Sequence, residues 1–426
     1  MRVESSRCHF TSLKIAPMTA PILALGIFCF AATAVHLASI LIVAVRFRRD
    51  ARQAGVAPQS QLPPVSLVRP LCGIDNYGDD TLRSTFTLDY SDYEILFCVA
   101  SAKDPVVPMV EALIAEYPGV NAKLLIGNEK VNNNPKLNNV LKGWRAAAHD
   151  WIILADSNVL MPADYIARLF ASWRADTGLV ASPPVGCRPD GVWAELECAF
   201  LNTYQARWQY LIDGLGRGFA QGKTMLWRRA DLDRAGGVEA LGKEVAEDAA
   251  ATKIVRDGGL NVRLVDRPFV QPLGRRTAAE VWNRQVRWAR LRRASFFLYF
   301  APEALAGGIL PMIAAAVVAN AAGWPAALCV GLLGSVWYGS EMALAVAAEW
   351  HLPALYPLYG LLRDLLLPAL FVDALRGSDF VWRGNEMEVA RLEPVRMMAR
   401  VRPRLQDVAR VSRRRLRSLR ERDHTG

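Results

Sequence analysis

Residues Trp151–Pro162, WIILADSNVLMP, combine an apolar run with a polar tip. The run Trp151–Ala155 has the length and composition of a strand that is buried on both faces. Asp156 and Asn158 follow at its end. In open α/β sheets, ligands bind outside the carboxyl ends of the strands. The stretch therefore predicts a buried strand that presents a carboxylate and an amide to a ligand site.

The surrounding sequence predicts an α/β fold with a mostly parallel sheet, because strand-like and helix-like segments alternate from residue 65 to about 270. Strands are expected at 65–69, 94–100, 122–126, 151–155 and 178–182. Helices are expected around 105–117, 135–148, 163–174, 246–257 and 277–293.

Residues 21–45 contain no formal charge and are long enough to span a bilayer, which requires roughly 20 apolar residues. Arg46, Arg48, Arg49 and Arg52 follow directly. Because cytoplasmic flanks are enriched in Lys and Arg, the carboxyl end of this span is expected in the cytosol.

A second apolar region lies near the carboxyl end. No charge occurs between Glu303 and Glu341, and Gly323-Trp324-Pro325 divides this part into two expected helices. The next apolar stretch, 355–375, contains charged residues, which are costly at bilayer depth, so it is expected to be interfacial, re-entrant or a third span. The predicted organisation is an N-terminal segment (1–20), a transmembrane helix (21–45), a cytosolic catalytic domain (46–300), a membrane region (301–376) and a basic cytosolic tail (377–426).

The charge distribution indicates a membrane surface more than a nucleic acid as the partner of the tail. The chain has 426 residues and a net charge of +10, and residues 396–426 carry eleven Arg against three acidic residues. This tail lacks the interleaved aromatic residues of single-strand binding surfaces, so no nucleic-acid partner is expected. A solvated tail is the simpler alternative. The chain has no Walker A, GxSxG, HExxH or zinc-like Cys/His motif.

Four short polar motifs are candidates for a functional site, and each, taken alone, is also compatible with a structural role. Asp104, before a proline, is typical of a turn or helix cap. Asp156 stands at a strand end, and Glu247-Asp248 precedes an alanine-rich helix, where acidic residues favour the first turn. The segment RQVRWARLRR (284–293) has the composition of a membrane-surface helix.

In this order, the four motifs resemble the D, D, D, (Q/R)xxRW pattern of inverting, family-2-like glycosyltransferases with a GT-A fold. The segments NPKLNNV (134–140), DSNV (156–159), AEDAAATK (246–253) and RQVRW (284–288) look like those of ceramide glucosyltransferases, family 21. The resemblance covers roughly residues 20–385. Gln205 stands where the animal enzymes have a histidine, and the Arg-rich extension is foreign to them, which suggests a bacterial member of the family.

The resemblance implies a nucleotide-sugar-binding, Rossmann-like GT-A domain with transmembrane helices and a UDP-sugar donor. It also implies roles for individual residues. Asp104 and Lys136 would contact the nucleotide, Asp156 would hold a divalent cation (Mg²⁺ or Mn²⁺), and Asp248 would be the catalytic base. Arg284, Arg287 and Trp288 would close over the diphosphate. Asn158 replaces the second carboxylate of a DxD motif, so the cation would depend more on the diphosphate itself.

The expected function is transfer of a hexose, with glucose as the first choice, to a ceramide-like membrane lipid at the bacterial inner membrane. A hopanoid or another lipid alcohol is the alternative acceptor. A processive polysaccharide synthase and a non-enzymatic membrane scaffold are further alternatives. Residues 192–215 are expected to form either an interfacial helix beside the acceptor path or an ordinary domain helix.

Overall fold

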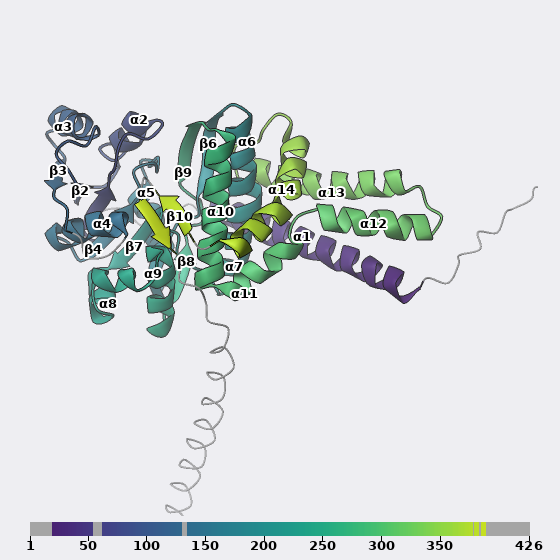
Figure 1. The fold of residues 1–426 in the computed structure, drawn as a ribbon. Helices are drawn as coiled ribbons and strands as arrows, with labels where there is room; N and C mark the ends of the chain where they lie inside the picture. The colour runs from purple at the N-terminus through teal and green to yellow at the C-terminus, as the bar shows by residue number, and fades with distance from the viewer. Residues whose placement is uncertain (1–18, 54–61, 130–133, 378, 383–384, 389–426) are drawn as a thin grey trace, which may run out of the picture.

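The computed structural model of the chain combines a sheet-containing part with three helices that project away from it (Figure 1). It describes residues 19–53, 62–129, 134–377, 379–382 and 385–388. Most of the 1–20 segment and the Arg-rich tail from residue 389 lie outside the described residues.

A seven-stranded sheet forms the centre of the catalytic part, in the order β3-β2-β1-β4-β7-β5-β8. All five strands predicted above are present. The strands are β1 Val65–Pro70, β2 Tyr93–Val99, β3 Asn121–Ile126, β4 Trp151–Ala155, β5 Thr177–Ala181, β7 Thr224–Arg228 and β8 Asn261–Leu264.

The sheet is mostly parallel, as predicted, but β7 runs antiparallel to both β4 and β5. Its register pairs Ala155 with Thr224. Consequently Asp156, which follows β4, lies beside Lys223, which precedes β7, and the Asp156 N–H donates to the Lys223 carbonyl at 3.0 Å. The alternating pattern of the sequence did not predict this strand.

Helices cover both faces of the sheet, as the continuous apolar run in β4 indicated. Ile152 and Leu154 pack on one side, and Ile153 and Ala155 on the other. The helices of this part are α2 Gly78–Arg83, α3 Val107–Glu116, α4 Pro135–Ala146, α5 Tyr165–Ala171, α8 Arg229–Arg234, η3 Val238–Lys243 and α9 Glu247–Asp257.

Helix α4 begins at a well-formed cap and packs closely on the sheet. The Asn134 side chain accepts hydrogen bonds from the backbone N–H groups of Lys136 (3.0 Å) and Leu137 (3.2 Å), and Pro135 occupies the first turn. At Gly143, a Cβ atom would lie 2.4 Å from the nearest side-chain carbon of Val68. Glycine is therefore required for this approach, and at the amino end of the same helix Lys136 contacts Asp156 at the polar tip of β4.

A second layer connects the sheet to the membrane helices. A parallel pair, β6 Val185–Asp190 and β9 Val270–Arg275, packs against α6 Val192–Ala199. Helix α6 continues through the π-helix η2 Phe200–Ala206 into α7 Arg207–Gly214, and α10 Ala278–Ser295 runs alongside. Residues 194–207 are almost entirely buried by protein. This burial favours the domain-helix interpretation of 192–215 over the interfacial one, although Val192, Trp193 and Leu215 at the two ends of the segment are exposed.

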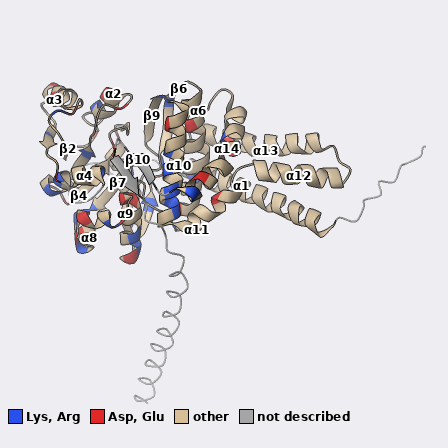
Figure 2. Ribbon diagram, in the orientation of Figure 1, with Lys and Arg blue, Asp and Glu red and all other residues tan. Residues whose placement is uncertain are grey.

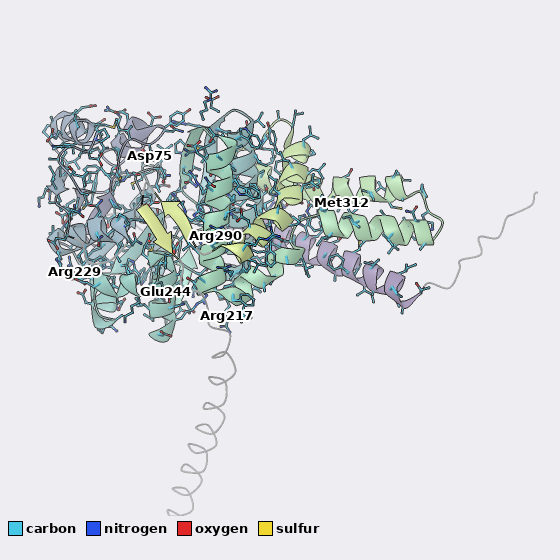
Figure 3. The ribbon with its side chains drawn as sticks, viewed as in Figure 1. Asp75, Arg217, Arg229, Glu244, Arg290 and Met312 are labelled. Carbon is cyan, nitrogen blue, oxygen red and sulfur yellow. The ribbon has the colours of Figure 1, made fainter. Side chains whose placement is uncertain are left out.

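The described part contains three helical segments that are long and apolar enough to cross a membrane: Ala20–Arg48, Phe297–Ala321 and Ala326–Ala347. They comprise most of α1 (Ala20–Gln53), then α11 Phe297–Phe300, η4 Ala301–Leu305 and α12 Ile309–Ala321, and finally α13 Ala326–Ala347. The amino end of α1 and the turn between α12 and α13 lie at the same far end (Figure 1). The projecting helices carry almost no charged residues, whereas charges cover the catalytic part (Figure 2). Met312 of α12 lies where these helices meet the catalytic part (Figure 3).

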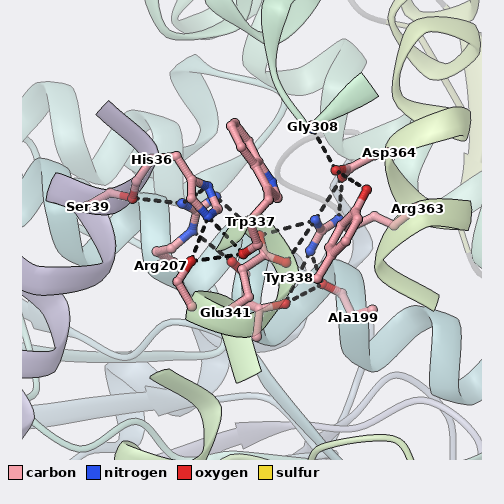
Figure 4. A network of polar contacts seen from close by, with 12 residues as sticks. His36, Ser39, Ala199, Arg207, Gly308, Trp337, Tyr338, Glu341, Arg363 and Asp364 are labelled. Carbon is pink, nitrogen blue, oxygen red and sulfur yellow. Dashed lines mark hydrogen bonds and ion pairs between the residues drawn. The ribbon is translucent and has the colours of Figure 1, made fainter. Parts of the chain in front are cut away.

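Helix α14, Tyr356–Arg376, is not one of these candidate spans, and it packs against α10 and α6. Two of its charged residues, Arg363 and Asp364, are buried in a polar network (Figure 4). The Arg363 guanidinium contacts the Glu341 carboxylate at 3.1 Å and the Asp364 carboxylate at 2.8 Å. The backbone N–H of Gly308 donates to Asp364 at 2.7 Å. The chain then forms a two-stranded antiparallel pair, β10 Asp379–Trp382 and β11 Asn385–Glu388.

The same network anchors α1. Arg207 of α7 donates to His36 Nδ1 (3.0 Å) and to the Ser39 hydroxyl (2.7 Å), and it lies 3.6 Å from Glu341 of α13. Farther along α1, Arg46 pairs with Asp213 at 2.5 Å and with Asp266 at 3.0 Å. These contacts fix α1 to the catalytic part at two points along its length.

Candidate active site

A large cavity of about 1870 Å³ extends from the polar tip of β4 to the membrane helix α1. Six of the seven predicted site residues line it together: Lys136, Asp156, Asp248, Arg284, Arg287 and Trp288. The seventh, Asp104, is not among the lining residues.

Asp156 is the centre of the charged end of the cavity. One carboxylate oxygen contacts the Lys136 ammonium at 2.7 Å, and the other contacts the Lys223 ammonium at 2.9 Å. Burial disfavours the charged carboxylate, but the two lysines outweigh it and hold the pKa of Asp156 well below its usual range. Asp156 is therefore ionised at any physiological pH.

The oxygen atoms beside Lys223 fit a cation. The Lys223 ammonium donates to Asp156 Oδ2 (2.9 Å) and to Asn158 Oδ1 (3.0 Å), so a carboxylate and an amide oxygen converge on one positive group. Oxygen atoms of this kind are ligands for Mg²⁺ and Mn²⁺. No cluster of three or more His, Cys, Asp or Glu side chains suited to a metal occurs in the described part of the chain. A metal at this position would thus need further ligands from a bound diphosphate.

Arg69 supports the loop that carries these oxygens. This residue of β1 is fully buried, and its guanidinium donates to the backbone carbonyls of Asp156 (2.9 Å), Ser157 (2.9 Å) and Val159 (3.2 Å). Burial lowers the pKa of Arg69 to about 10, so it stays charged at neutral pH. An arginine inside a strand gave no sign of this role in the sequence.

Asp248 lies at the first turn of α9, half-buried in the cavity wall. Burial and the neighbouring Glu247 raise the pKa of Asp248 to about 6, against the opposing effects of Lys136 and of the Gly222 N–H, which donates to Asp248 Oδ2 at 3.1 Å. A carboxylate with a pKa near neutrality is suited to accept a proton during a reaction.

Lys136 connects the two acidic groups of the site. Its ammonium contacts Asp156 at 2.7 Å and Glu247 at 2.6 Å, and it donates to the Gly222 carbonyl at 2.7 Å. Although burial disfavours its charge, the two carboxylates raise the pKa of Lys136. At Gly222, a Cβ atom would lie 2.8 Å from Glu247 Oε1, so only glycine leaves room for this arrangement.

Helix α10 presents one face to the cavity. Its lining residues recur at helical spacing: Arg284, Arg287, Trp288, Leu291, Arg292 and Ser295. Glu197 of α6 is fully buried and contacts the Arg284 guanidinium at 2.5 Å and Arg276 at 3.5 Å. The sequence gave no indication that Glu197 positions the first arginine of RQVRW.

Asp104 has a structural position next to the site. Its carboxylate accepts hydrogen bonds from the backbone N–H groups of Gly73 (3.0 Å) and Val106 (3.0 Å), which joins the loops after β1 and β2. Cys72 and Ala100, from the same two loops, do line the cavity. The predicted contact between Asp104 and a nucleotide remains a prediction.

The other end of the cavity is apolar. Five residues of α1 line the cavity at positions i, i+3, i+4, i+7 and i+8, and all but the last are apolar: Phe28, Ala31, Ala32, Val35 and His36. Opposite them are Leu298 of α11 and Leu305 of η4. Since these helices are candidate membrane spans, one cavity joins a charged centre to an apolar wall within a membrane segment.

Comparison with known proteins agrees with this arrangement. The model of the family described as glycosyl transferase family 21 matches residues 31–394. The chain is similar to ceramide glucosyltransferase 1 of Caenorhabditis elegans, at 28% identity over 342 residues, which cover 79% of this chain and 73% of the relative. It is also similar to ceramide glucosyltransferase 3 of the same organism, at 26% identity over 371 residues, covering 85% and 80%.

Among solved structures, the chain is similar to the mannosyltransferase PcManGT from Pyrobaculum calidifontis, in complex with GDP-Man and Mn²⁺. The TM-score is 0.47 at 19% identity, and the match covers 83% of this chain and 98% of that one. The family match includes the part of α1 from residue 31 onward, the catalytic part with its charged site residues, and α14. The chain belongs to glycosyltransferase family 21.

Proposed function

We propose that the chain transfers a hexose, with glucose as the first choice, from a UDP-sugar to a ceramide-like membrane lipid and inverts the anomeric configuration. The observation that carries this proposal is the continuous cavity with a charged end at Asp156 and an apolar wall on α1. Curated relatives with the name ceramide glucosyltransferase support the same acceptor class.

The charged end suits a nucleotide diphosphate. Lys136, Lys223 and Arg284 bring positive charge to it, and such groups stabilise the negative charge that develops on a departing diphosphate. Asp156 and Asn158 would hold a divalent cation, Mg²⁺ or Mn²⁺, which when bound would neutralise part of that charge. Arg287 and Trp288 line the cavity on the side of α10, where they would border the donor.

Asp248 would act as the general base. It would take the proton of the lipid hydroxyl as the hydroxyl oxygen forms a bond to the anomeric carbon, while the bond from that carbon to the diphosphate oxygen breaks. Attack from the face opposite the leaving group converts an α-linked donor into a β-glycoside. The two products are therefore UDP and a β-glycosylated lipid.

The apolar wall explains how a lipid acceptor would reach the base. A helix rises about 1.5 Å per residue, so Val35 lies about 16 Å and Phe28 about 27 Å along α1 from Arg46. The Arg46 end is held at the catalytic part by Asp213 and Asp266. The lining face of α1 would then lie within a hydrocarbon layer about 30 Å thick. We place the catalytic domain on the cytosolic side of the bacterial inner membrane.

The test uses the purified chain in lipid nanodiscs with UDP-glucose, Mn²⁺ and one acceptor at a time: ceramide, a hopanoid alcohol or diacylglycerol. A β-glucosylated ceramide, identified by mass and by the anomeric proton coupling, is the expected product. Asp248→Asn serves as the inactive control. If the hopanoid alcohol were glucosylated and ceramide were not, the hopanoid would replace ceramide as the proposed acceptor. The proposal would be refuted if no acceptor were glycosylated, with UDP-glucose or with any other UDP-sugar.

A further inference from the structure

Lys223 has a position that the transfer reaction alone does not explain. Its ammonium lies between Asp156 Oδ2 (2.9 Å) and Asn158 Oδ1 (3.0 Å), the same two oxygens that fit a divalent cation. The Lys223 side chain lines the cavity and is 20% exposed, so it can move toward a ligand there.

The backbone holds this lysine in place. Lys223 directly precedes β7, and its carbonyl accepts the Asp156 N–H at 3.0 Å, so the antiparallel register of β4 and β7 fixes the two residues side by side. The preceding residue, Gly222, donates to Asp248 at 3.1 Å and accepts from Lys136 at 2.7 Å. The backbone of Lys223 is thus fixed, and its flexible side chain can exchange partners.

A second lysine on Asp156 makes a simple structural role for Lys223 unnecessary. Lys136 already neutralises the other oxygen of Asp156 and also contacts Glu247 and Gly222. The Lys223 ammonium donates to Asp156 and Asn158, and the nearby positive charges of Arg284 and Lys136 oppose its own charge. A diphosphate in the cavity would offer this ammonium stronger partners, because phosphate oxygens are good acceptors for charged donors.

We propose that Lys223 is a cation lock: without a donor its ammonium takes the position of the divalent cation, and with the donor it moves onto the diphosphate. The metal is then held only together with the nucleotide, which prevents occupation of Asp156 by a free metal ion. This inference deepens the proposed function by adding a residue that couples metal binding to nucleotide binding.

The test measures binding, independently of any lipid. Mn²⁺ binding to the full-length chain in detergent is followed by electron paramagnetic resonance, with and without UDP, for the wild type and for Lys223→Met. In the wild type, UDP should strengthen Mn²⁺ binding within the usual range of coupling, about 5–150-fold. In Lys223→Met, Mn²⁺ should bind without UDP roughly tenfold more tightly than in the wild type, and the effect of UDP should shrink.

The control variants separate the lock from a general loss of positive charge. Lys136→Met removes a lysine from the same carboxylate but leaves the position beside Asn158 filled, so its gain in Mn²⁺ affinity without UDP should be smaller. Lys223→Arg keeps the charge and should retain most of the coupling. Far-ultraviolet circular dichroism and thermal melting of each variant check the fold.

Two results would overturn the proposal. One is an unchanged or weaker affinity of Lys223→Met for Mn²⁺ without UDP. The other is a wild type that binds no Mn²⁺ even with UDP. Either result can occur whether or not the chain glycosylates a lipid, because no acceptor is present. Failure of the lock is thus distinguishable from failure of the proposed function.

Discussion

Asp248 has a property that suits the proposed general base, a pKa raised toward neutrality. Its pKa is raised to about 6, first by burial and then by Glu247. The base is active only when deprotonated, so kcat/KM should be constant above about pH 7 and fall about tenfold per unit below pH 6. Glu247→Gln removes one of the two causes and should shift this acid limb to lower pH. If the acid limb of Glu247→Gln stays at the same pH or moves to higher pH, the group that titrates in kcat/KM is not Asp248.

Asp156 should be essential for a different reason, since it organises positive charge and does not transfer a proton. We expect Asp156→Ala to lower kcat by about a hundredfold or more, because both lysines and the cation lose their common partner. Chelation of divalent ions in the wild type should cause a comparable loss, restored by Mn²⁺ or Mg²⁺. Near-normal rates in both the variant and the chelated enzyme would refute the assignment.

Among the elements, α1 is both a candidate membrane span and one wall of the cavity. Ala32 is on its lining face, whereas Ala38 is exposed and does not line the cavity. We expect Ala32→Trp to raise the apparent KM for the lipid about tenfold or more without changing the KM for the UDP-sugar, the pattern of a lost acceptor site.

Ala38→Trp is the matched control, because it adds the same bulk to the same helix on another face. It should leave both KM values near those of the wild type. Equal effects of the two substitutions, or an effect of Ala32→Trp on the UDP-sugar alone, would contradict an acceptor path along α1.

Helix α14 carries charged residues within an otherwise apolar sequence, and these need partners from other helices. Arg363 is fully buried between Glu341 and Asp364. Removal of one partner from a buried ion pair typically costs about 3–5 kcal/mol, because the remaining charge is left unpaired. Arg363→Ala should therefore lower the apparent Tm in detergent markedly. Arg376→Ala, at the exposed end of the same helix, should leave it unchanged, and similar melting of both variants would argue against the network.

For the whole molecule, the arrangement of the three candidate spans predicts a topology. If α1 enters the cytosol at its Arg-rich end, the α12–α13 hairpin returns the chain to the same side, and α14 stays there. Residue 190 and the carboxyl end at 426 should both be cytosolic. In a variant whose native cysteines are replaced by serine, a membrane-impermeant maleimide should then fail to label Asp190→Cys in intact bacterial cells, although it labels the same variant after lysis.

A reporter fused after residue 426 checks the other end of the chain. A green fluorescent protein fused there should fluoresce, because it folds in the cytosol. An alkaline phosphatase fused at the same place should be inactive, because it requires export. The reverse result would mean that α14 crosses the membrane. Its buried Arg363 and Asp364 would then require a different environment from the one described here.

The local sequence was sufficient to predict several helices, strands and site residues of this protein. The buried strand at 151–155, the carboxylate at its end, the apolar span at 21–45 and the face of α10 all follow from short-range patterns. Such patterns indicate which side of a helix or strand is buried and where the element ends. Both properties depend on residues that are close together in the sequence. The order of the four motifs was also sufficient to identify the family, which the match over residues 31–394 confirms.

Only the tertiary structure decided which charges meet. Lys223 reaches Asp156 because β7 runs antiparallel to β4, Arg69 holds three carbonyls of the loop after β4, and Glu197 positions Arg284 from another helix. Each of these pairs is separated by 67 to 90 residues. The energy of a buried ion pair depends on distance and desolvation in the folded chain, which no local spacing encodes.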